Sequence, residues 1–321
     1  MLVMLRTLLC VVALCATPAL ADSWPSRPIH LIVAYAPGGT GDVVARLLSD
    51  KLATALGQSV VVENRAGASG AIGARAVATA TPDGYMLLLG QTGEISINQH
   101  WLKDLGYDPD KELQPIALAS VVSLALVVPA KAPYSTMQNF VTYLKSGKPV
   151  SFASAGVGTP GFFAGEALKA GLNANMTHVP YKGAGPALND LLGAHVDMYF
   201  PGFPAVTPQV KAGSLKLLAV SSSIRVLSAP DVPTVAEVTG LKTFDFTLWQ
   251  GIFAPRGTPA DVIKRLNTEI NKILATDEIK TKFTELRADI RPTTVEEFTR
   301  FVQAESAKYV EVIKATGAKP E

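Results

Sequence analysis

The sequence has only two cysteines, Cys10 and Cys15, and both lie close to its first residue. They belong to an apolar segment that follows one basic residue and is too short to cross a bilayer. A small-x-small pattern ends at Ala21 and is typical of signal-peptidase cleavage. We therefore expect a signal peptide at residues 1–21, cleavage near Ala21/Asp22, and a periplasmic mature protein.

The mature chain would then contain no cysteine, which excludes disulfides and thiolate metal ligands. Histidine is scarce as well, and the four residues have neither a paired ligand spacing nor an H-E-x-x-H motif: His30, His100, His178 and His195. We therefore predict no metal site and no cofactor.

No charge of one sign dominates, because 29 Lys and Arg stand against 27 Asp and Glu, a formal net charge of +2. A surface that binds nucleic acid or an anionic membrane needs a basic excess, so we expect neither partner. The chain of 321 residues is long enough for about two domains.

Two glycine-rich turns, at residues 34–46 and 151–166, each lead from a strand-like segment into helix-like sequence. The apolar spacing predicts strands at 29–33, 60–62, 85–89, 124–128, 150–153, 176–179, 196–200 and 215–220, and helices at 43–55, within 66–80, and at 137–144, 163–170, 186–192, 262–274 and 294–313. The repeated strand–turn–helix order predicts an α/β fold in two similar units.

The second turn contains G-x-G-x-x-G at Gly156, Gly158 and Gly161, the spacing of a dinucleotide-binding turn. No acid follows at the end of the next strand to bind a ribose, and Pro160 removes one amide donor. Neither turn has a P-loop lysine, and residues 67–71 lack the last glycine of a nucleophile elbow. We predict no catalytic residue, although a dyad assembled by folding stays open.

Amide groups at the start of a helix bind anions without a cationic side chain. In open α/β sheets, ligands bind beyond the carboxyl ends of the strands, where both turns are expected. Two facing lobes would thus present two anion-binding turns across one cleft. The alternative is that the glycines only permit tight turns.

The sequence resembles the Bug family, the periplasmic substrate-binding proteins of tripartite tricarboxylate transporters. The similar segments run in order through almost the whole mature chain and include Ala36-Pro37-Gly38-Gly39-Thr40-Gly41-Asp42, Val62-Glu63-Asn64-Arg65-Ala66-Gly67-Ala68, Thr81-Pro82-Asp83-Gly84-Tyr85, Ser154-Ala155-Gly156-Val157-Gly158-Thr159-Pro160-Gly161, Val179-Pro180-Tyr181-Lys182-Gly183 and Phe253-Ala254-Pro255-Arg256-Gly257-Thr258-Pro259.

The resemblance implies a type II periplasmic binding protein, or Venus flytrap, in which each lobe is a mixed, mainly parallel sheet flanked by helices. It also implies two crossovers between the lobes, near residues 120–123 and 221–225. We therefore expect residues 22–122 and 223–321 to form a discontinuous first lobe, and residues 123–222 to form the second.

The resemblance further implies that the two turns hold a ligand carboxylate, with ordered water. The implied binding residues are Gly38, Gly39, Thr40 and Asp42 on the first turn and Ser154, Ala155, Gly156, Gly158 and Thr159 on the second. Asp42 is expected to organise its turn rather than touch an anion, because two carboxylates repel. Tyr181 and Asp197 lie in similar segments, where packing or turn support is the alternative.

The distal end of the cleft should set specificity, and there the sequence departs from the family. This end is expected to include Gln91, Thr92 and Glu94. Glu94 is an acid where relatives usually have a small or hydroxyl residue. An ionised Glu94 in the cleft would repel a second ligand carboxylate and accept an amino, pyridinium or hydroxyl group, whereas a solvent-facing Glu94 would have no such effect. Phe203 and Trp249 are expected either to add aromatic walls or to lie in the core.

The expected function is that of a solute-binding receptor, not an enzyme. Its ligand would be a small dicarboxylate, amino carboxylate or aromatic carboxylate, its partner the permease subunits of the transporter, and its state monomeric. The alternatives are a sensor subunit that presents its ligand to a signalling partner, or an exported hydrolase on the same fold.

Overall fold

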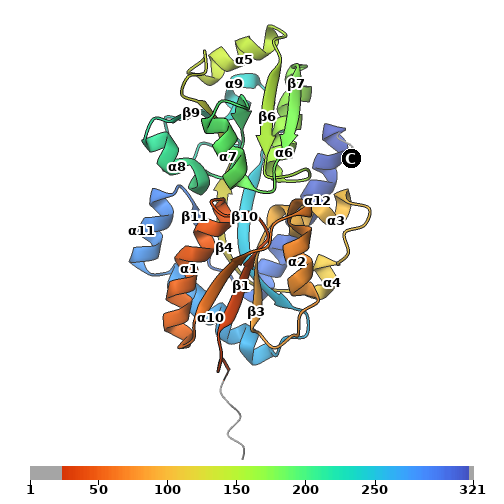
Figure 1. Cartoon of the computed structure of the whole chain (residues 1–321), viewed down its shortest axis with the longest axis vertical. Helices are drawn as coiled ribbons and strands as arrows, with labels where there is room; N and C mark the ends of the chain where they lie inside the picture. The colour runs from red at the N-terminus through yellow and green to blue at the C-terminus, as the bar shows by residue number, and fades with distance from the viewer. Residues whose placement is uncertain (1–23, 318–321) are drawn as a thin grey trace, which may run out of the picture.

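A computed structural model describes residues 24–317 and shows two lobes, each built around one β-sheet (Figure 1). The signal peptide expected at residues 1–21 lies outside the described residues. The six-stranded sheet of the first lobe has the order β11 (Asp289–Ile290), β4 (Leu113–Ser123), β10 (Thr247–Pro255), β3 (Met86–Gln91), β1 (Ile29–Val33) and β2 (Val60–Asn64). The five-stranded sheet of the second has the order β7 (Met176–Pro180), β6 (Val150–Ser154), β8 (Met198–Tyr199), β5 (Ala125–Pro129) and β9 (Leu215–Val220).

Helices flank both sheets. Those around the first sheet are α1 (Thr40–Leu56), η1 (Ala68–Gly70), α2 (Ala71–Ala78), η2 (Gly93–Ile97, a π-helical turn), α3 (Asn98–Trp101), α4 (Pro109–Glu112), α10 (Ala260–Leu274), α11 (Asp277–Glu285) and α12 (Val295–Thr316). Those around the second are α5 (Met137–Lys145), α6 (Pro160–Leu172), α7 (Ala184–Leu192), α8 (Phe203–Lys211) and α9 (Val235–Thr239). The expected α/β two-lobe fold is confirmed.

Both sheets are mixed, with parallel pairs at one end only. In the first sheet β1 pairs in parallel with β2 and β3, but β10 pairs antiparallel with β3 and β4. In the second sheet β6 pairs in parallel with β7 and β8, but β5 pairs antiparallel with β8 and β9. The antiparallel share exceeds the expectation of a mainly parallel sheet, because β4 and β10 carry the chain out of the first lobe and back.

The chain crosses to the second lobe at Leu124, the single residue between β4 and β5. The return comes later than the boundary at residues 222/223 that the sequence suggests. After β9, Val220 forms a bridge with Thr234, α9 packs against α5, and the Phe244 ring lies 6.0 Å from that of Phe200. We therefore propose that residues 223–246 belong to the second lobe and that the return is at the start of β10.

Four buried clusters form the cores: two lie in the first lobe, one lies in the second, and the fourth joins second-lobe residues to Ile97, Trp101 and Tyr309 of the first. In α1 the buried Val44, Leu48 and Leu52 recur at helical spacing, and Gly57 ends the helix in the left-handed conformation that glycine favours. The last helix, α12, begins with the expected capping box of Thr294 and Glu297. It packs on both lobes, since Phe298 is buried against Trp249 of β10 and Tyr309 against Phe163 of α6.

Candidate functional site

The first glycine-rich turn leads into α1, whose first residues have no side-chain cap. Gly39 is the N-cap residue, and the first helical hydrogen bond joins the Val43 amide to the Gly39 carbonyl oxygen at 3.1 Å. The amides of residues 40–42 therefore have no carbonyl partner within the helix. Together with the positive end of the helix dipole, they favour an anion.

The second turn leads into α6 in the same way. Thr159 is the N-cap residue, but its side chain does not cap the helix, and the first helical bond joins the Phe163 amide to the Thr159 carbonyl oxygen at 3.1 Å. Pro160 at the first helical position has no amide hydrogen, so this helix start offers fewer donors than α1. Both helix starts are nevertheless open to an anion.

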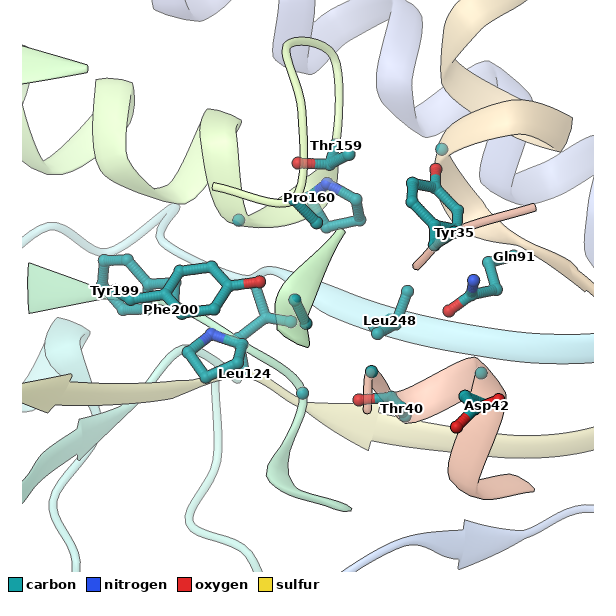
Figure 2. A pocket seen from close by; sticks show the side chains of 18 of the residues that line it. Tyr35, Thr40, Asp42, Gln91, Leu124, Thr159, Pro160, Tyr199, Phe200 and Leu248 are labelled. Atoms are coloured by element: carbon teal, nitrogen blue, oxygen red, sulfur yellow. The ribbon is translucent and has the colours of Figure 1, made fainter. Parts of the chain in front are cut away.

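The two turns border one cavity between the lobes (Figure 2). Six residues expected from the sequence line it, namely Gly39, Thr40, Asp42, Gln91, Ala155 and Thr159. Its volume is about 50 Å³, on a measure where one water needs about 10–15 Å³. This conformation therefore holds only a few water-sized groups, and a larger ligand requires the lobes to part.

The lobes touch beside this cavity. The Ala36 amide of the first turn donates to the Lys182 carbonyl oxygen of the second lobe at 3.2 Å. A Cβ atom at Gly185 would lie 2.1 Å from the Pro37 carbonyl oxygen, so only glycine permits this approach. The structure thus shows a closed arrangement of the two lobes.

Three neutral polar side chains at the cavity keep their hydrogen-bonding capacity. Thr40, Gln91 and Tyr199 are 3%, 5% and 2% exposed, and their side chains form no hydrogen bond with another described residue. In Figure 2 the hydroxyl of Thr40 and the amide oxygen of Gln91 point towards the open space between the labelled side chains. Buried polar groups are normally hydrogen-bonded, so these three side chains are candidates to bind a ligand or water.

The electrostatics of the cavity come from the backbone. Among the described residues that line it, none has a cationic side chain, and Asp42 alone is ionised. Asp42 accepts hydrogen bonds from the Gly38 amide at 3.1 Å and from Arg46 at 2.9 Å. Burial raises the pKa of Asp42, but these hydrogen bonds outweigh burial and hold the pKa below its ordinary value. Asp42 therefore organises the first turn, as the sequence suggests.

Glu94 matches neither of the two expectations from the sequence. It is neither an ionised group in the cleft nor a side chain in solvent. It is fully buried and does not line the cavity, because the Tyr35 side chain lies between them. Its carboxyl accepts the Gln91 amide at 2.7 Å and lies 2.9 Å from the Tyr35 hydroxyl. Burial raises the pKa of Glu94 to about 8, so the carboxyl is mostly uncharged at neutral pH.

Four residues expected at the site shape the turns without lining the cavity. Gly38, Gly156 and Gly158 have φ angles of 84°, 142° and 78°, which strongly favour glycine. Ser154 is fully buried, and its hydroxyl oxygen accepts the Gly156 amide at 3.1 Å.

Four other expected residues lie away from the cavity. Thr92 is buried and accepts the Trp249 amide at 3.0 Å, while Trp249 itself packs in the first-lobe core. Tyr181 donates to Asp190 at 2.6 Å, and Asp197 accepts the Ser151 amide at 2.7 Å. The fourth, Phe203, is 1% exposed in a core cluster of the second lobe. These residues support local structure, because each is already engaged elsewhere.

The sequence interpretation missed the walls of the cavity. Tyr35 and Tyr199 contribute aromatic rings, and the apolar walls are Leu124, Phe200, Pro201 and Leu248. The residues around Tyr199 follow a strand end, where the rule for open α/β sheets does point. Nothing distinguishes Leu124 and Leu248 from core residues, because their position depends on where β4 and β10 cross between the lobes.

Two serine–histidine contacts bear on the hydrolase alternative. The Ser154 hydroxyl lies 2.7 Å from His178 Nε2, and the Ser306 hydroxyl lies 2.7 Å from His100 Nε2. None of these four residues lines the cavity. Burial lowers the pKa of His178 to about 4, so this imidazole is neutral and a structural partner of the second turn.

Within residues 24–317, no helix is long and apolar enough to cross a membrane. The same part of the chain has no group of three or more His, Cys, Asp or Glu side chains arranged to hold a metal ion.

The family model described as "Tripartite tricarboxylate transporter family receptor" matches residues 44–318. The chain belongs to this family. Protein BugT of Bordetella pertussis (strain Tohama I) is 35% identical over 307 residues, which are 95% of this chain and 94% of BugT. Members of this receptor family are solute-binding receptors rather than enzymes, and the Bug resemblance is confirmed.

Two solved structures of family members each resemble at least 90% of the chain. An R. palustris protein with adipate is 32% identical, with a TM-score of 0.89, and covers 93% of this chain and 100% of its own. MatC from Rhodopseudomonas palustris with bound malate is 33% identical, with a TM-score of 0.84, and covers 90% of this chain and 100% of its own. The receptor family therefore includes proteins that bind carboxylates on this fold.

Proposed function

We propose that this receptor is exported to the periplasm, captures a small carboxylate between its lobes and delivers it to the permease subunits of a tripartite tricarboxylate-type transporter. The observation that carries the proposal is the pair of uncapped helix starts, from different lobes, that border one cavity. A ligand that contacts both turns stabilises the closed arrangement, which gives the permease a loaded form to recognise.

The charge balance of the cavity favours a ligand with one carboxylate. Each helix start is equivalent to roughly +0.5 elementary charge, so the starts of α1 and α6 together balance about one negative charge. Asp42 is already paired with Arg46, and no cationic side chain among the described lining residues could balance a second carboxylate. A dianion would therefore leave one buried charge without compensation.

The rest of the ligand should be uncharged. Apolar side chains of Leu124, Phe200 and Leu248 line the cavity, together with the neutral groups of Gln91 and Tyr199. An amino group would find no unpaired carboxylate, since Asp42 is paired with Arg46 and Glu94 is buried behind Tyr35 and mostly protonated at neutral pH. The ligand class narrows to a compact monocarboxylate with an apolar or hydroxyl-bearing body.

Three four-carbon acids test the charge of the ligand at constant length: butyrate, succinate and 4-aminobutyrate. The mature protein would be unfolded, freed of ligand and refolded, and its affinity measured by isothermal titration calorimetry beside a wider carboxylate panel that includes benzoate. We expect one site per chain and a preference of about tenfold or more for butyrate, because an uncompensated charge costs at least about 1.4 kcal/mol.

Leu248→Lys adds a positive charge to the apolar wall of the cavity. Leu248→Met is the control, because methionine has a similar volume and no charge. The lysine should shift preference towards succinate, while methionine should keep the wild-type order. Tighter binding of succinate than butyrate by the wild type would refute the single-charge ligand but leave the receptor role intact. If no carboxylate of the panel binds, or if the bound acid is chemically converted, the receptor function itself is wrong.

A further inference from the structure

The contacts of the Tyr35 hydroxyl depend on whether the Glu94 carboxyl is ionised. The Tyr35 hydroxyl lies 2.9 Å from Glu94 Oε2 and 3.1 Å from the Ser69 carbonyl oxygen. A phenol has one hydrogen, so it cannot donate fully to both acceptors. If Glu94 carries a proton, Glu94 donates to Tyr35, and Tyr35 donates to Ser69. Both contacts are then satisfied.

Ser69 links this chain of hydrogen bonds to the second lobe. It belongs to a short turn, residues 67–70, in which Ala68 and Ser69 have φ angles of 45° and 51°. Such angles are uncommon for residues other than glycine and must be held by their surroundings. The Ser69 carbonyl oxygen accepts Asn98 Nδ2 at 2.9 Å in addition to the Tyr35 hydroxyl.

The turn at residues 67–70 meets the second glycine turn across the closed cleft. A Cβ atom at Gly156 would lie 2.8 Å from Ser69 Oγ and 3.4 Å from Ser69 Cα, which shows how closely the two turns approach. Holding Ser69 in place therefore holds the first-lobe surface on which the second turn rests.

We propose that Glu94 is a positioning residue whose proton, passed as a hydrogen bond through Tyr35 to Ser69, stabilises the closed lobes and thereby couples ligand binding to proton uptake. The inference rests on the proposed receptor function. When the lobes part, water reaches Tyr35 and the ionised form of Glu94 becomes less costly. Closure around a ligand therefore favours the protonated form.

The direction of the pH effect follows from the groups around Glu94. Tyr35 and Tyr107 face it, the latter through a hydrogen bond to the Glu94 carbonyl oxygen, and Tyr199 faces Tyr35 from the second lobe. Other ionisable groups on the elements packed against residues 93–97 include Arg75, His100, Asp110, Lys111, Glu112, Arg300, Glu305 and Lys308, and none of these forms an ion pair with Glu94. No cation opposes the effect of burial, so the pKa of Glu94 rises from 4.5 to about 8.

The first experiment measures affinity for butyrate, or for the tightest acid of the panel, at pH 6.5 and 9.5. Wild-type Kd should increase about tenfold, which corresponds to a one-unit change in the Glu94 pKa on binding. Calorimetry near pH 8 in buffers of different ionisation enthalpy should show proton uptake. In Glu94→Gln the side-chain amide donates to Tyr35 at every pH. The ratio of Kd at pH 9.5 to Kd at pH 6.5 should therefore fall below about twofold.

Tyr107→Phe is the matched control, because it removes a buried hydroxyl that contacts Glu94 only through its carbonyl oxygen. The ratio of its Kd values at pH 9.5 and 6.5 should equal that of the wild type. A wild-type affinity that is flat over this range, or the same pH dependence in Glu94→Gln, would overturn the inference while leaving carboxylate binding intact.

The ligand-free protein gives a second, independent readout. The pKa of Glu94 is about 8 in the closed arrangement and lower where the lobes part, so the stability that Glu94 contributes is full below pH 4.5 and is lost as pH rises through its folded pKa. Over that window Glu94 alone should lower the folding equilibrium constant by about tenfold per pH unit, and Glu94→Gln should remove this slope. An unchanged slope in Glu94→Gln would show that the carboxyl carries no proton in this range, even if no acid of the panel binds.

Discussion

Thr40 is the first residue of α1 and Thr159 is the N-cap residue of α6, and their hydroxyl groups have different roles. Thr40 forms no side-chain hydrogen bond with another described residue and faces the cavity. Thr159 donates to the Gly156 carbonyl oxygen at 2.7 Å and so holds its own turn together. The hydroxyl of Thr40 therefore remains available to a ligand, whereas that of Thr159 supports its own turn.

The same contrast extends to the surroundings of the turns. The first turn is held by the ion pair of Asp42 with Arg46, which leaves the amides at the start of α1 free. The second turn rests on the first-lobe residues Asn98 and Trp101 through Gly158. We therefore expect the first turn to be the main anion site and the second to close over it. Equal sequence patterns do not imply equal roles.

Gly158→Ala should have the largest effect on binding. The φ angle of Gly158 is 78°, and a Cβ atom there would lie 2.9 Å from Trp101 Cδ1 and 3.1 Å from Asn98 Oδ1. The methyl group would separate the second turn from the first lobe, so we expect affinity to fall by more than about thirtyfold, or about 2 kcal/mol. Calorimetry with the tightest acid of the panel would measure the loss.

Gly147→Ala is the matched control for this substitution. Its φ angle is 77°, and nothing lies within 4 Å of a Cβ atom. It should lose about 1–2 kcal/mol of unfolding free energy from the left-handed conformation alone, with its ligand affinity unchanged. If Gly158→Ala binds as well as Gly147→Ala, the second turn does not close the site.

Much of this arrangement follows from local sequence signals. The strand–turn–helix units, the capping box at Thr294, and the role of Asp42 were all predictable because each depends on residues close together in the chain. The cavity itself was less predictable. Leu124 and Leu248 become lining residues only because β4 and β10 cross between the lobes, and no short pattern encodes that crossing.

Glu94 is a second residue whose environment no short sequence pattern encodes. An acid in a loop after a strand is typical of a solvent-exposed or ligand-facing group. The sequence does not reveal that Tyr35, 59 residues earlier, and Tyr107 surround it and exclude water. Predicting its protonation requires the tertiary contacts that bury it.

Substituting valine for each of the two threonines should separate their roles. Thr40→Val removes a hydroxyl that only a ligand or water can use, so affinity should fall by about 0.5–1.5 kcal/mol with little change in stability. Thr159→Val breaks the hydrogen bond to the Gly156 carbonyl oxygen, so the unfolding free energy should fall by about 1 kcal/mol. Chemical denaturation and calorimetry on both variants would measure the two quantities.

The pattern across the two variants decides the comparison. The second turn would be the main anion site if Thr159→Val lost ligand affinity without losing stability, or if Thr40→Val lost stability without losing ligand affinity.

Arg46→Met should have the smallest effect, and it tests whether the charge of Asp42 is felt at the first turn. Arg46 is 56% exposed at its side chain and pairs with Asp42 at 2.9 Å. Without this cation, Asp42 would repel the ligand carboxylate, but solvent screens an exposed charge, so we expect only about a threefold loss of affinity, or about 0.7 kcal/mol. Lys169→Met on α6 is the matched control, because Lys169 pairs with Glu166 and not with the second turn. The difference between the two variants should shrink in 0.5 M salt, where charges are screened within about 4–5 Å. Equal effects of the two variants at low salt would mean that Asp42 does not influence the anion, and that the free amides of α1 alone distinguish the first turn from the second.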